Sequence, residues 1–400
     1  MIADCGINGF EFAAARAGLR GRDGLDVGLI VCRQEAAAAA VFTTNLVQAA
    51  PVVLGRERIK SGRLRAVLVN SAIANACTGD EGMANAERCA ALTAGALEVD
   101  EETVLVSSTG VIGEQLEMER FEAVIPELAA GLSPGALPEV ARAVMTTDTV
   151  PKISTRKARL RTTGEEIKIS GIAKGAGMIM PDMATMLSFI MTDARISPAL
   201  LRALLPMAVE QSFNRITVDG DTSTNDTVII MAGGGSGGRE INDLESPEAA
   251  VFAGMLNDIT RDLALQIVAD GEGATKLVTI RVRGALTDAE AELAARTVAD
   301  SALVKTAFFG ADPNWGRILA ALGRSGAAFN PAETAISIGN SELVKDGCLV
   351  SAAAERSAAQ IMAQKEFFLL IDLKAGNAEA EIYTCDLSLD YVRINADYRT

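Results

Sequence analysis

Short runs of apolar residues recur along the chain, each bounded by glycine or by small polar residues. Runs of this length that are rich in Val, Ile and Leu are typical of buried β-strands. The sequence predicts strands at residues 6–12, 25–32, 65–70, 103–106, 186–191, 228–231 and 277–283, and a hairpin formed by residues 158–162 and 166–170. Residues 35–40 favour a helix by propensity but precede a strand-like segment, so their conformation stays open.

Segments with helical periodicity alternate with these strands. The predicted helices cover residues 81–97, 198–213, 247–269 and 287–300. Ser246 and Pro247 are a typical N-cap and first helical residue, and Thr287 begins a capping box with Glu290. Trp315 is predicted to lie in a turn before a further helix. Because strands and helices alternate, the predicted fold class is α/β, with sheets sandwiched between layers of helices.

The composition restricts the class of protein. Of the 400 residues, 49% are apolar and 22% are charged, which is enough to bury a large core. The net charge of −15 argues against nucleic acid or an anionic membrane as a partner, because both attract basic surfaces. The six cysteines are scattered without a Cys-x-x-Cys pair, and the first residues lack the features of a signal peptide. We therefore expect a cytoplasmic, non-membrane protein with reduced thiols.

The chain contains no histidine. This absence excludes Ser-His-Asp and Cys-His catalysis, and it also excludes imidazole metal ligands. Any acyl or proton transfer must use another base, chiefly Lys, Asp, Glu or an α-amino group.

Hydroxyl-rich segments follow two of the predicted strands. Residues 107–110, Ser-Ser-Thr-Gly, present hydroxyls together with an unhindered backbone N–H, as an oxyanion hole requires. The alternative is an ordinary capped loop. Asn70, Ser71 and Asn75 follow the preceding strand, and they either contact a ligand or only satisfy the backbone of a turn.

Other polar segments allow more than one interpretation. Residues 146–152 form a second hydroxyl cluster, and Glu272 between two glycines is either a site for an ammonium ligand or a solvated loop acid. Residues 218–227 are dense in oxygen ligands but do not match a calcium loop, so we interpret them as a hydrogen-bonded loop. Residues 233–238 contain G-x-G-x-x-G, but no helix follows directly, which favours a turn over a dinucleotide site.

The segment 174–187, KGAGMIMPDMATML, combines flexible glycines, Pro181 and a small-residue Ala184–Thr185 peptide bond that a turn can strain. It resembles the processing site of the glutamate N-acetyltransferase / ornithine acetyltransferase family, the self-cleaving enzymes of arginine biosynthesis. Further matches to that family occur in order over nearly the whole chain, at residues 107–113, 146–152, 218–227, 270–276 and 312–317.

The resemblance implies that the chain cuts its own Ala184–Thr185 bond. The products would be an α chain, residues 1–184, and a β chain, residues 185–400, that begins with the nucleophile Thr185. The Thr185 hydroxyl would attack the preceding carbonyl, and water would resolve the resulting ester. The new α-amino group, with an ordinary pKa of about 7.7, would then act as the base that the missing histidines cannot provide.

The resemblance also implies ping-pong transfer of an acetyl group from N-acetylornithine to glutamate. Thr109 and Gly110 match the oxyanion hole of the family. Its substrate-binding positions fall on Thr149, Lys174, Thr185, Glu272, Asn395 and Thr400, with Thr147 as a rival for Thr149. Lys174 would pair with a substrate carboxylate and Glu272 with an ornithine ammonium. Two α and two β chains would form a heterotetramer without a metal or cofactor, and the use of acetyl-CoA as a further acetyl donor stays open.

The sequence departs from the family pattern at two places. Residues 71–75 lack the Gly-Asn pair expected after the serine, and Met180-Pro181-Asp182 replaces a more usual Ala-Pro-Asn before the cleavage site. Two alternatives also stand. One is a self-processing amidase or aminopeptidase, in which water accepts the acyl group. The other is a non-enzymatic protein in which the glycine-rich segment is only a tight turn.

Overall fold

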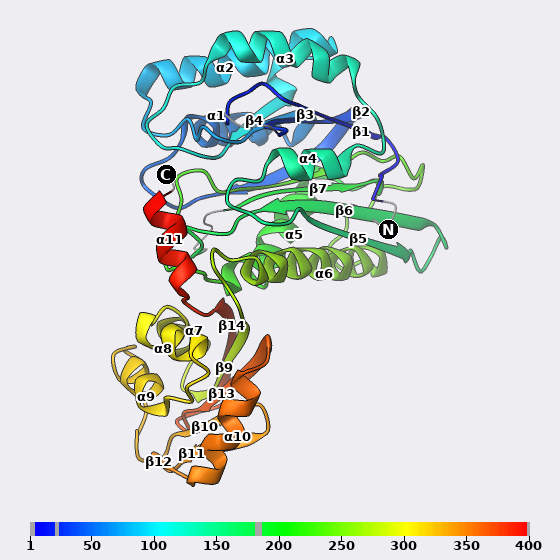
Figure 1. Cartoon of the computed structure of the whole chain (residues 1–400). Helices are drawn as coiled ribbons and strands as arrows, with labels where there is room; N and C mark the ends of the chain where they lie inside the picture. The colour runs from blue at the N-terminus through cyan, green and yellow to red at the C-terminus, as the bar shows by residue number, and fades with distance from the viewer. Residues whose placement is uncertain (1–4, 21–23, 181–185, 398–400) are drawn as a thin grey trace. The chain divides into compact units, whose positions relative to one another are not determined.

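The computed structural model of the chain describes residues 5–20, 24–180 and 186–397. The chain divides into two compact units, whose helices and strands are labelled in Figure 1. The first unit contains the chain up to Asn214 and the segment Asp221–Ile267. The second contains Arg215–Gly220 and continues from Val268.

An eight-stranded sheet forms the centre of the first unit. Its strand order is β4-β3-β2-β8-β7-β6-β5, and β1 pairs with β2. The pairs β3-β4 and β7-β8 are parallel, and the other neighbours are antiparallel. The strands are β1 Phe10–Ala15, β2 Val27–Phe42, β3 Arg63–Asn70, β4 Val104–Ser108, β5 Lys152–Arg159, β6 Glu166–Lys174, β7 Leu187–Thr192 and β8 Thr227–Ala232.

The long strand β2 connects two parts of this sheet. Its first half pairs with β1 and β3, its second half pairs with β8, and the register with β3 shifts between Val31 and Ala36. Phe12 and Ile30 of the first part share one buried cluster with Phe189 of β7. The two parts of the sheet therefore pack face to face across a common core.

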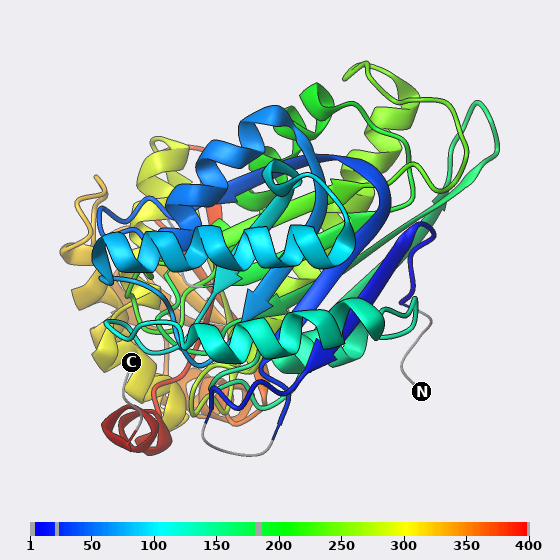
Figure 2. The same cartoon turned by 90° about the horizontal axis from the view of Figure 1, so that it is seen from above.

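Helices cover the outer faces of both parts. Figure 1 shows α2 and α3 above β1–β4 and α6 below β5–β7, and Figure 2 shows α2 and α3 lying across the strands. The helix α5 packs against β2. These layers confirm the predicted helix–sheet sandwich. The helices of this unit are α1 Ala50–Arg58, α2 Gly79–Leu97, α3 Met118–Ala130, α4 Leu137–Ala143, α5 Pro198–Glu210 and α6 Pro247–Ala269.

The second unit has a six-stranded sheet of order β12-β11-β10-β13-β9-β14. Alternate residues of β9, such as Val278 and Ile280, are buried in one cluster with Ala294 and Val298 of α7. The elements are β9 Leu277–Ala285, α7 Asp288–Ala299, α8 Ala302–Phe309, α9 Trp315–Gly323, β10 Ala335–Ile338, β11 Ser341–Lys345, β12 Cys348–Leu349, α10 Ala352–Met362, β13 Glu366–Asp372, β14 Ala378–Cys385 and α11 Leu389–Asp397.

Local sequence signals located most of these elements. The predicted caps form, since Ser246 Oγ accepts the Ala249 N–H at 3.1 Å and Thr287 Oγ1 accepts the Glu290 N–H at 3.2 Å. Several boundaries differ from the prediction. β1 begins at Phe10, β5 covers Lys152–Arg159 instead of residues 158–162, α5 ends at Glu210, and Trp315 is the first residue of α9 rather than a turn residue. The helix α9 begins there because Asn314 Oδ1 accepts the Arg317 N–H at 3.2 Å.

The alanine-rich segment at residues 35–40 belongs to β2. Ala37 pairs with Arg63 of β3 on one side and with Ala232 of β8 on the other. Backbone hydrogen bonds to two neighbouring strands outweigh the small helix preference of alanine. In the part of the chain that the structure describes, no helix is both long and apolar enough to cross a membrane.

Candidate active site

The turn after β4 holds the two residues predicted to form an oxyanion hole. Gly110 has a φ of 134°, and a Cβ at this position would lie 2.0 Å from the carbonyl carbon of Ala72. The Val111 N–H donates to the Ala72 carbonyl at 2.8 Å, which fixes this close approach. Only glycine fits the position, because any side chain would collide with backbone.

The donors of this turn remain available for a ligand. The Thr109 N–H is used, since it donates to the Asn70 carbonyl at 3.0 Å. Among the described residues, neither the Thr109 hydroxyl nor the Gly110 N–H has a hydrogen-bond partner. Thr109 is buried, so an anion bound here would meet the two donors in a partly dehydrated place. This arrangement favours the oxyanion hole over an ordinary capped loop.

Two buried asparagines support the turn. Asn70 Nδ2 donates to the Ile73 carbonyl at 2.9 Å, and Asn225 Nδ2 donates to the carbonyls of Ala74 at 2.6 Å and Ser108 at 2.8 Å. Asn70 therefore satisfies turn backbone, which is the second of the two interpretations considered for it. The role of Asn225 was not predicted, because it bridges segments more than a hundred residues apart in the sequence.

The other two polar residues after β3 also bind backbone. Ser71 Oγ donates to the Ala143 carbonyl at 2.7 Å, and Asn75 Nδ2 donates to the Gly82 carbonyl at 2.9 Å. Both side chains are buried. They stabilise the loop next to the Thr109–Gly110 turn without facing a ligand.

Asp148 joins the second hydroxyl cluster to the glycine-rich segment. Its fully buried carboxylate accepts the Thr146 N–H at 3.0 Å, the Lys152 ammonium at 2.6 Å and the Gly175 N–H at 2.8 Å. Burial raises the pKa of Asp148, but the charges of Lys152 and Lys174 more than offset this effect, so the pKa lies below its ordinary value. Residues 146–152 are thereby fixed to the end of β6.

Replacement of Asp148 by Asn is expected to lower the free energy of unfolding by about 3–5 kcal/mol, because the buried Lys152 ammonium would lose the carboxylate with which it forms an ion pair. The matched control is Glu57→Gln in the exposed Lys60–Glu57 pair, for which a change below about 1 kcal/mol is expected. Urea unfolding at one protein concentration measures both. Equal effects of the two substitutions would contradict the prediction.

The stabilisation by Asp148 also depends on pH. A carboxyl whose pKa is lowered on folding contributes its full stability above its unfolded pKa of about 3.9. This contribution is lost as the pH falls through the lower folded value.

Lys174 lies at the end of β6, beside the start of β7. It pairs with Leu187, which in turn pairs with Thr227 of β8. Lys174 is buried. Its charge helps to lower the pKa of Asp148 on one side, and on the other side it partly offsets the increase that burial causes in the pKa of Asp226. Asp226 directly follows Asn225, whose side chain donates to the Ser108 carbonyl. Because Lys174 acts on Asp226, it belongs to the same region of the first unit as the Thr109–Gly110 turn.

Other predicted site residues fall into two groups. Ala184 and Thr185, together with Pro181 and Asp182, lie outside the described residues, as does Thr400. Thr149 is exposed and Thr147 is half-buried. The choice between these two threonines as the substrate-binding residue stays a prediction.

In the second unit, Glu272 and Asn395 come together. Asn395 Nδ2, on α11, donates to Glu272 Oε2 at 2.7 Å, and Glu272 is only 7% exposed. Gly273 has a φ of 68°, and a Cβ there would lie 2.5 Å from the Tyr391 nitrogen, so α11 packs tightly against this loop. Glu272 is thus a buried, positioned carboxylate, and the interpretation as a solvated loop acid is wrong.

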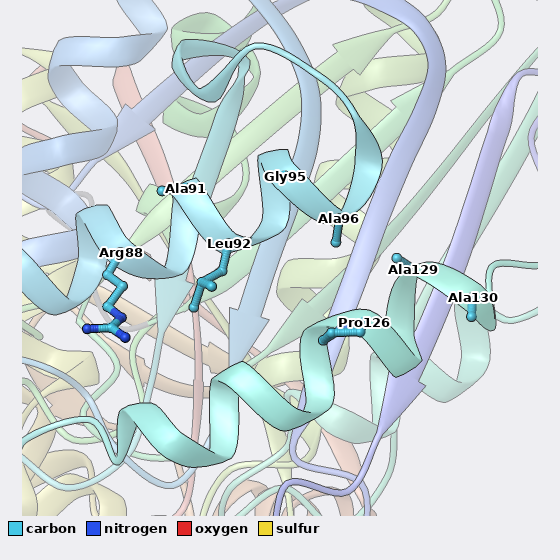
Figure 3. Close-up of a pocket in the computed structure, with 8 residues that line it drawn as sticks. All are labelled: Arg88, Ala91, Leu92, Gly95, Ala96, Pro126, Ala129 and Ala130. Atoms are coloured by element: carbon cyan, nitrogen blue, oxygen red, sulfur yellow. The ribbon is translucent and has the colours of Figure 1, made fainter.

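A hollow of about 740 Å³ lies between α2 and α3 (Figure 3). Apart from Arg88, its lining is apolar, and it includes none of the predicted site residues. Such a surface does not suit a zwitterionic amino acid. The described residues also contain no group of three acidic or cysteine side chains that could hold a metal ion.

Comparison with known proteins agrees with the resemblance found in the sequence. The model of the ArgJ family matches residues 11–400. The arginine biosynthesis bifunctional protein ArgJ of Desulfotalea psychrophila is 53% identical over 98% of this chain and 100% of its own length, and that of Geobacter sulfurreducens is 50% identical over the same shares. The crystal structure of the arginine biosynthesis bifunctional protein argJ from Bacillus halodurans matches with a TM-score of 0.51 at 43% identity, covering 54% of this chain and 100% of that one. The chain therefore belongs to the ArgJ family of arginine biosynthesis enzymes.

Proposed function

We propose that the chain transfers an acetyl group from N-acetylornithine to glutamate through an acetyl ester on Thr185. The observation that carries the proposal is the pair of unpartnered donors, the Thr109 hydroxyl and the Gly110 N–H, on a turn that only glycine can form. Membership of the ArgJ family supports the reaction class. Acyl transfer needs such donors because the carbonyl oxygen becomes negative in the tetrahedral intermediate.

The nucleophile would be produced by cleavage of the Ala184–Thr185 bond. The Thr185 hydroxyl attacks the Ala184 carbonyl, the amide becomes an ester with a free α-amino group, and water hydrolyses the ester. In the mature enzyme this α-amino group removes the proton of the Thr185 hydroxyl as it attacks the acetyl donor. A chain without histidine requires a base of this kind.

The buried charged groups fit amino-acid substrates. Glu272, oriented by Asn395, would accept the side-chain ammonium of N-acetylornithine, and Lys174 would pair with a substrate carboxylate. Thr149 or Thr147, Thr185 and Thr400 complete the proposed substrate contacts. No cofactor is required for the transfer, because the acetyl group stays covalently attached to substrate or enzyme.

The two chains formed by the cut would remain associated. β6 and β7 flank the cleavage site and pair along their length, from Ile169–Thr192 to Lys174–Leu187. Backbone hydrogen bonds and the common core do not depend on the connecting segment. We propose a complex of two α and two β chains in the cytoplasm, with molar mass by light scattering as the measurement.

Two measurements test the proposed function. Denaturing mass spectrometry should show two fragments that meet at Ala184 and Thr185, and an intact wild-type chain would overturn the cleavage. Incubation with N-acetylornithine should yield N-acetylglutamate only when glutamate is present. Release of acetate at a rate that glutamate does not change would instead support the hydrolase alternative.

A second acetyl donor is part of the proposal. The word bifunctional in the names of the relatives leads us to propose that acetyl-CoA also acetylates Thr185. The decisive assay contains glutamate and acetyl-CoA but no N-acetylornithine. Absence of N-acetylglutamate in this assay would restrict the enzyme to one donor.

Glu272→Gln is expected to raise the KM for N-acetylornithine roughly ten- to hundredfold, the range for losing a hydrogen bond to a charged group. The KM for glutamate, which carries no side-chain ammonium, should change much less. Glu381→Gln removes a carboxylate that pairs with Arg281 elsewhere in the same unit and serves as the control. Equal increases in both KM values for Glu272→Gln would contradict the assigned role.

A further inference from the structure

Asp226 is fixed at the start of β8, next to the start of β7. The Thr43 N–H donates to the Asp226 carbonyl at 2.9 Å, and the Thr227 N–H donates to the Met186 carbonyl at 3.0 Å. These bonds hold the Asp226 backbone between β2 and the residue that directly follows Thr185. Its position is therefore set by the sheet rather than by a free loop.

The Asp226 carboxyl is buried without a hydrogen-bond partner. The residue is 4% exposed, and neither side-chain oxygen makes a hydrogen bond among the described residues. Leaving a buried polar group unpaired costs about 1–3 kcal/mol, and more for a charged group. Such groups are rare in folded proteins, and a catalytic role or a bound water or ion is a usual explanation for them. The environment of Asp226 thus points to a partner that the described residues do not supply.

Burial dominates the environment of the Asp226 carboxyl. Burial raises the pKa of Asp226 well above its ordinary value. The Met186 N–H, the Lys174 charge and the Thr43 hydroxyl face the carboxyl and lower its pKa in part, although none forms a hydrogen bond of normal geometry with it. A carboxyl with a raised pKa beside the Met186 N–H can both give and take a proton there.

Covalent geometry connects this carboxyl to the cleavage reaction. Three bonds separate the Met186 nitrogen from the nitrogen of the preceding residue, Thr185. With standard bond lengths, the two nitrogens are never more than about 4 Å apart, whatever the torsion angles. The Asp226 carboxyl therefore faces the N–H of the residue whose nitrogen lies no more than about 4 Å from the nitrogen of the scissile bond.

We propose that Asp226 carries the proton that the self-cleavage must move from the Thr185 hydroxyl to the Thr185 nitrogen. This inference rests on the proposed cleavage at Thr185 and assigns it a further participant. Once the amine is free, the same carboxyl would pair with it.

The proposed step balances in atoms and charge. The Oγ–C bond to the Ala184 carbonyl carbon forms, and the C–N bond between Ala184 and Thr185 breaks. Asp226 gives its proton to the departing nitrogen and recovers one from the attacking hydroxyl, so the carboxyl is unchanged and the amide has become an ester and a neutral amine. Water then hydrolyses the ester, which restores the hydroxyl and leaves the Ala184 carboxylate.

The test compares Asp226→Asn, Asp226→Glu and the control Asp193→Asn in the full chain. Asp193 is a buried aspartate at the other end of β7, and its carboxylate accepts the Lys168 N–H at 2.7 Å. Cleavage is followed by denaturing mass spectrometry, and folding is followed by near-UV circular dichroism. We expect Asp226→Asn to fold but to cleave about 10²-fold or more slowly. Asp226→Glu should retain more cleavage than Asp226→Asn, and Asp193→Asn should cleave as the wild type does.

The variants separate a proton carrier from a structural residue. Asn has the shape of Asp but cannot carry the proton, whereas Glu can carry it but is one methylene longer. A structural role would make Asn the better replacement, so faster cleavage of Asp226→Asn than of Asp226→Glu would overturn the inference. Cleavage of Asp226→Asn at the wild-type rate would also overturn it. If Asp226→Asn does not fold, the pH of half-maximal cleavage in Asp226→Glu decides. A shifted value supports the inference, and an unchanged value overturns it. An intact wild-type chain would overturn the proposed function itself. None of the results for the variants has that consequence.

Discussion

Thr185→Ala is expected to leave the chain as one uncut polypeptide without acetyltransferase activity. The substitution removes the hydroxyl that we propose attacks the Ala184 carbonyl and later the acetyl donor. An uncut chain would also lack the proposed α-amino base. Loss of a nucleophile and of its base together lowers the rate by about 10⁴-fold or more. Intact mass under denaturing conditions and formation of N-acetylglutamate measure the two effects.

Thr185→Ser is the matched control for this variant. Serine retains the hydroxyl and loses only a methyl group, so we expect a cut chain with reduced but measurable transfer. Normal activity of Thr185→Ala would refute the assigned nucleophile. A Thr185→Ala chain that is still cut at position 184 would show that cleavage has another cause, such as a contaminating protease.

Gly110→Ala is expected to lower kcat about 10²–10³-fold, the usual effect of losing one oxyanion donor. An alanine Cβ would lie 2.0 Å from the Ala72 carbonyl carbon, and alanine also disfavours the observed φ of 134°. The turn must therefore move, which displaces both the Gly110 N–H and the Thr109 hydroxyl. The rate of transfer at saturating N-acetylornithine and glutamate is the measurement.

Gly113→Ala separates this effect from general strain in the loop. Gly113 also has a positive φ, 88°, but a Cβ at this position would have no neighbouring atom within 4 Å. We expect Gly113→Ala to lose some stability and to retain most of its kcat. Equal losses of kcat in the two variants, with equal melting temperatures, would argue against a specific role for Gly110.

The sequence predicted the elements whose signals are local. Apolar runs located most strands of the first unit and β9 of the second. The caps at Ser246 and Thr287 form as expected because each involves residues within one helical turn. The strand at residues 35–40 was not predicted. Its conformation depends on pairing with β3 and β8, whose positions no local rule provides.

The candidate site residues also divide into those with a local sequence signal and those without one. Thr109 and Gly110 could be identified from the sequence because a hydroxyl and a glycine after a strand have a direct chemical meaning. Asp148, Asn225 and Asp226 could not, because their roles depend on partners far away in the sequence. The position of Asn395 beside Glu272 likewise depends on the terminal helix α11, which the sequence pattern did not predict.

The pairing of β6 with β7 bears on how long the mature enzyme persists. When the uncut chain unfolds, the segment between Lys174 and Leu187 still links β6 and β7 covalently. Refolding is therefore a first-order process. After the cut, unfolding would let the two polypeptides diffuse apart, and recovery would become second-order and sensitive to dilution. The enzyme would thus owe its lifetime to a high barrier against unfolding, since a dissociated pair rarely meets again at cellular concentrations.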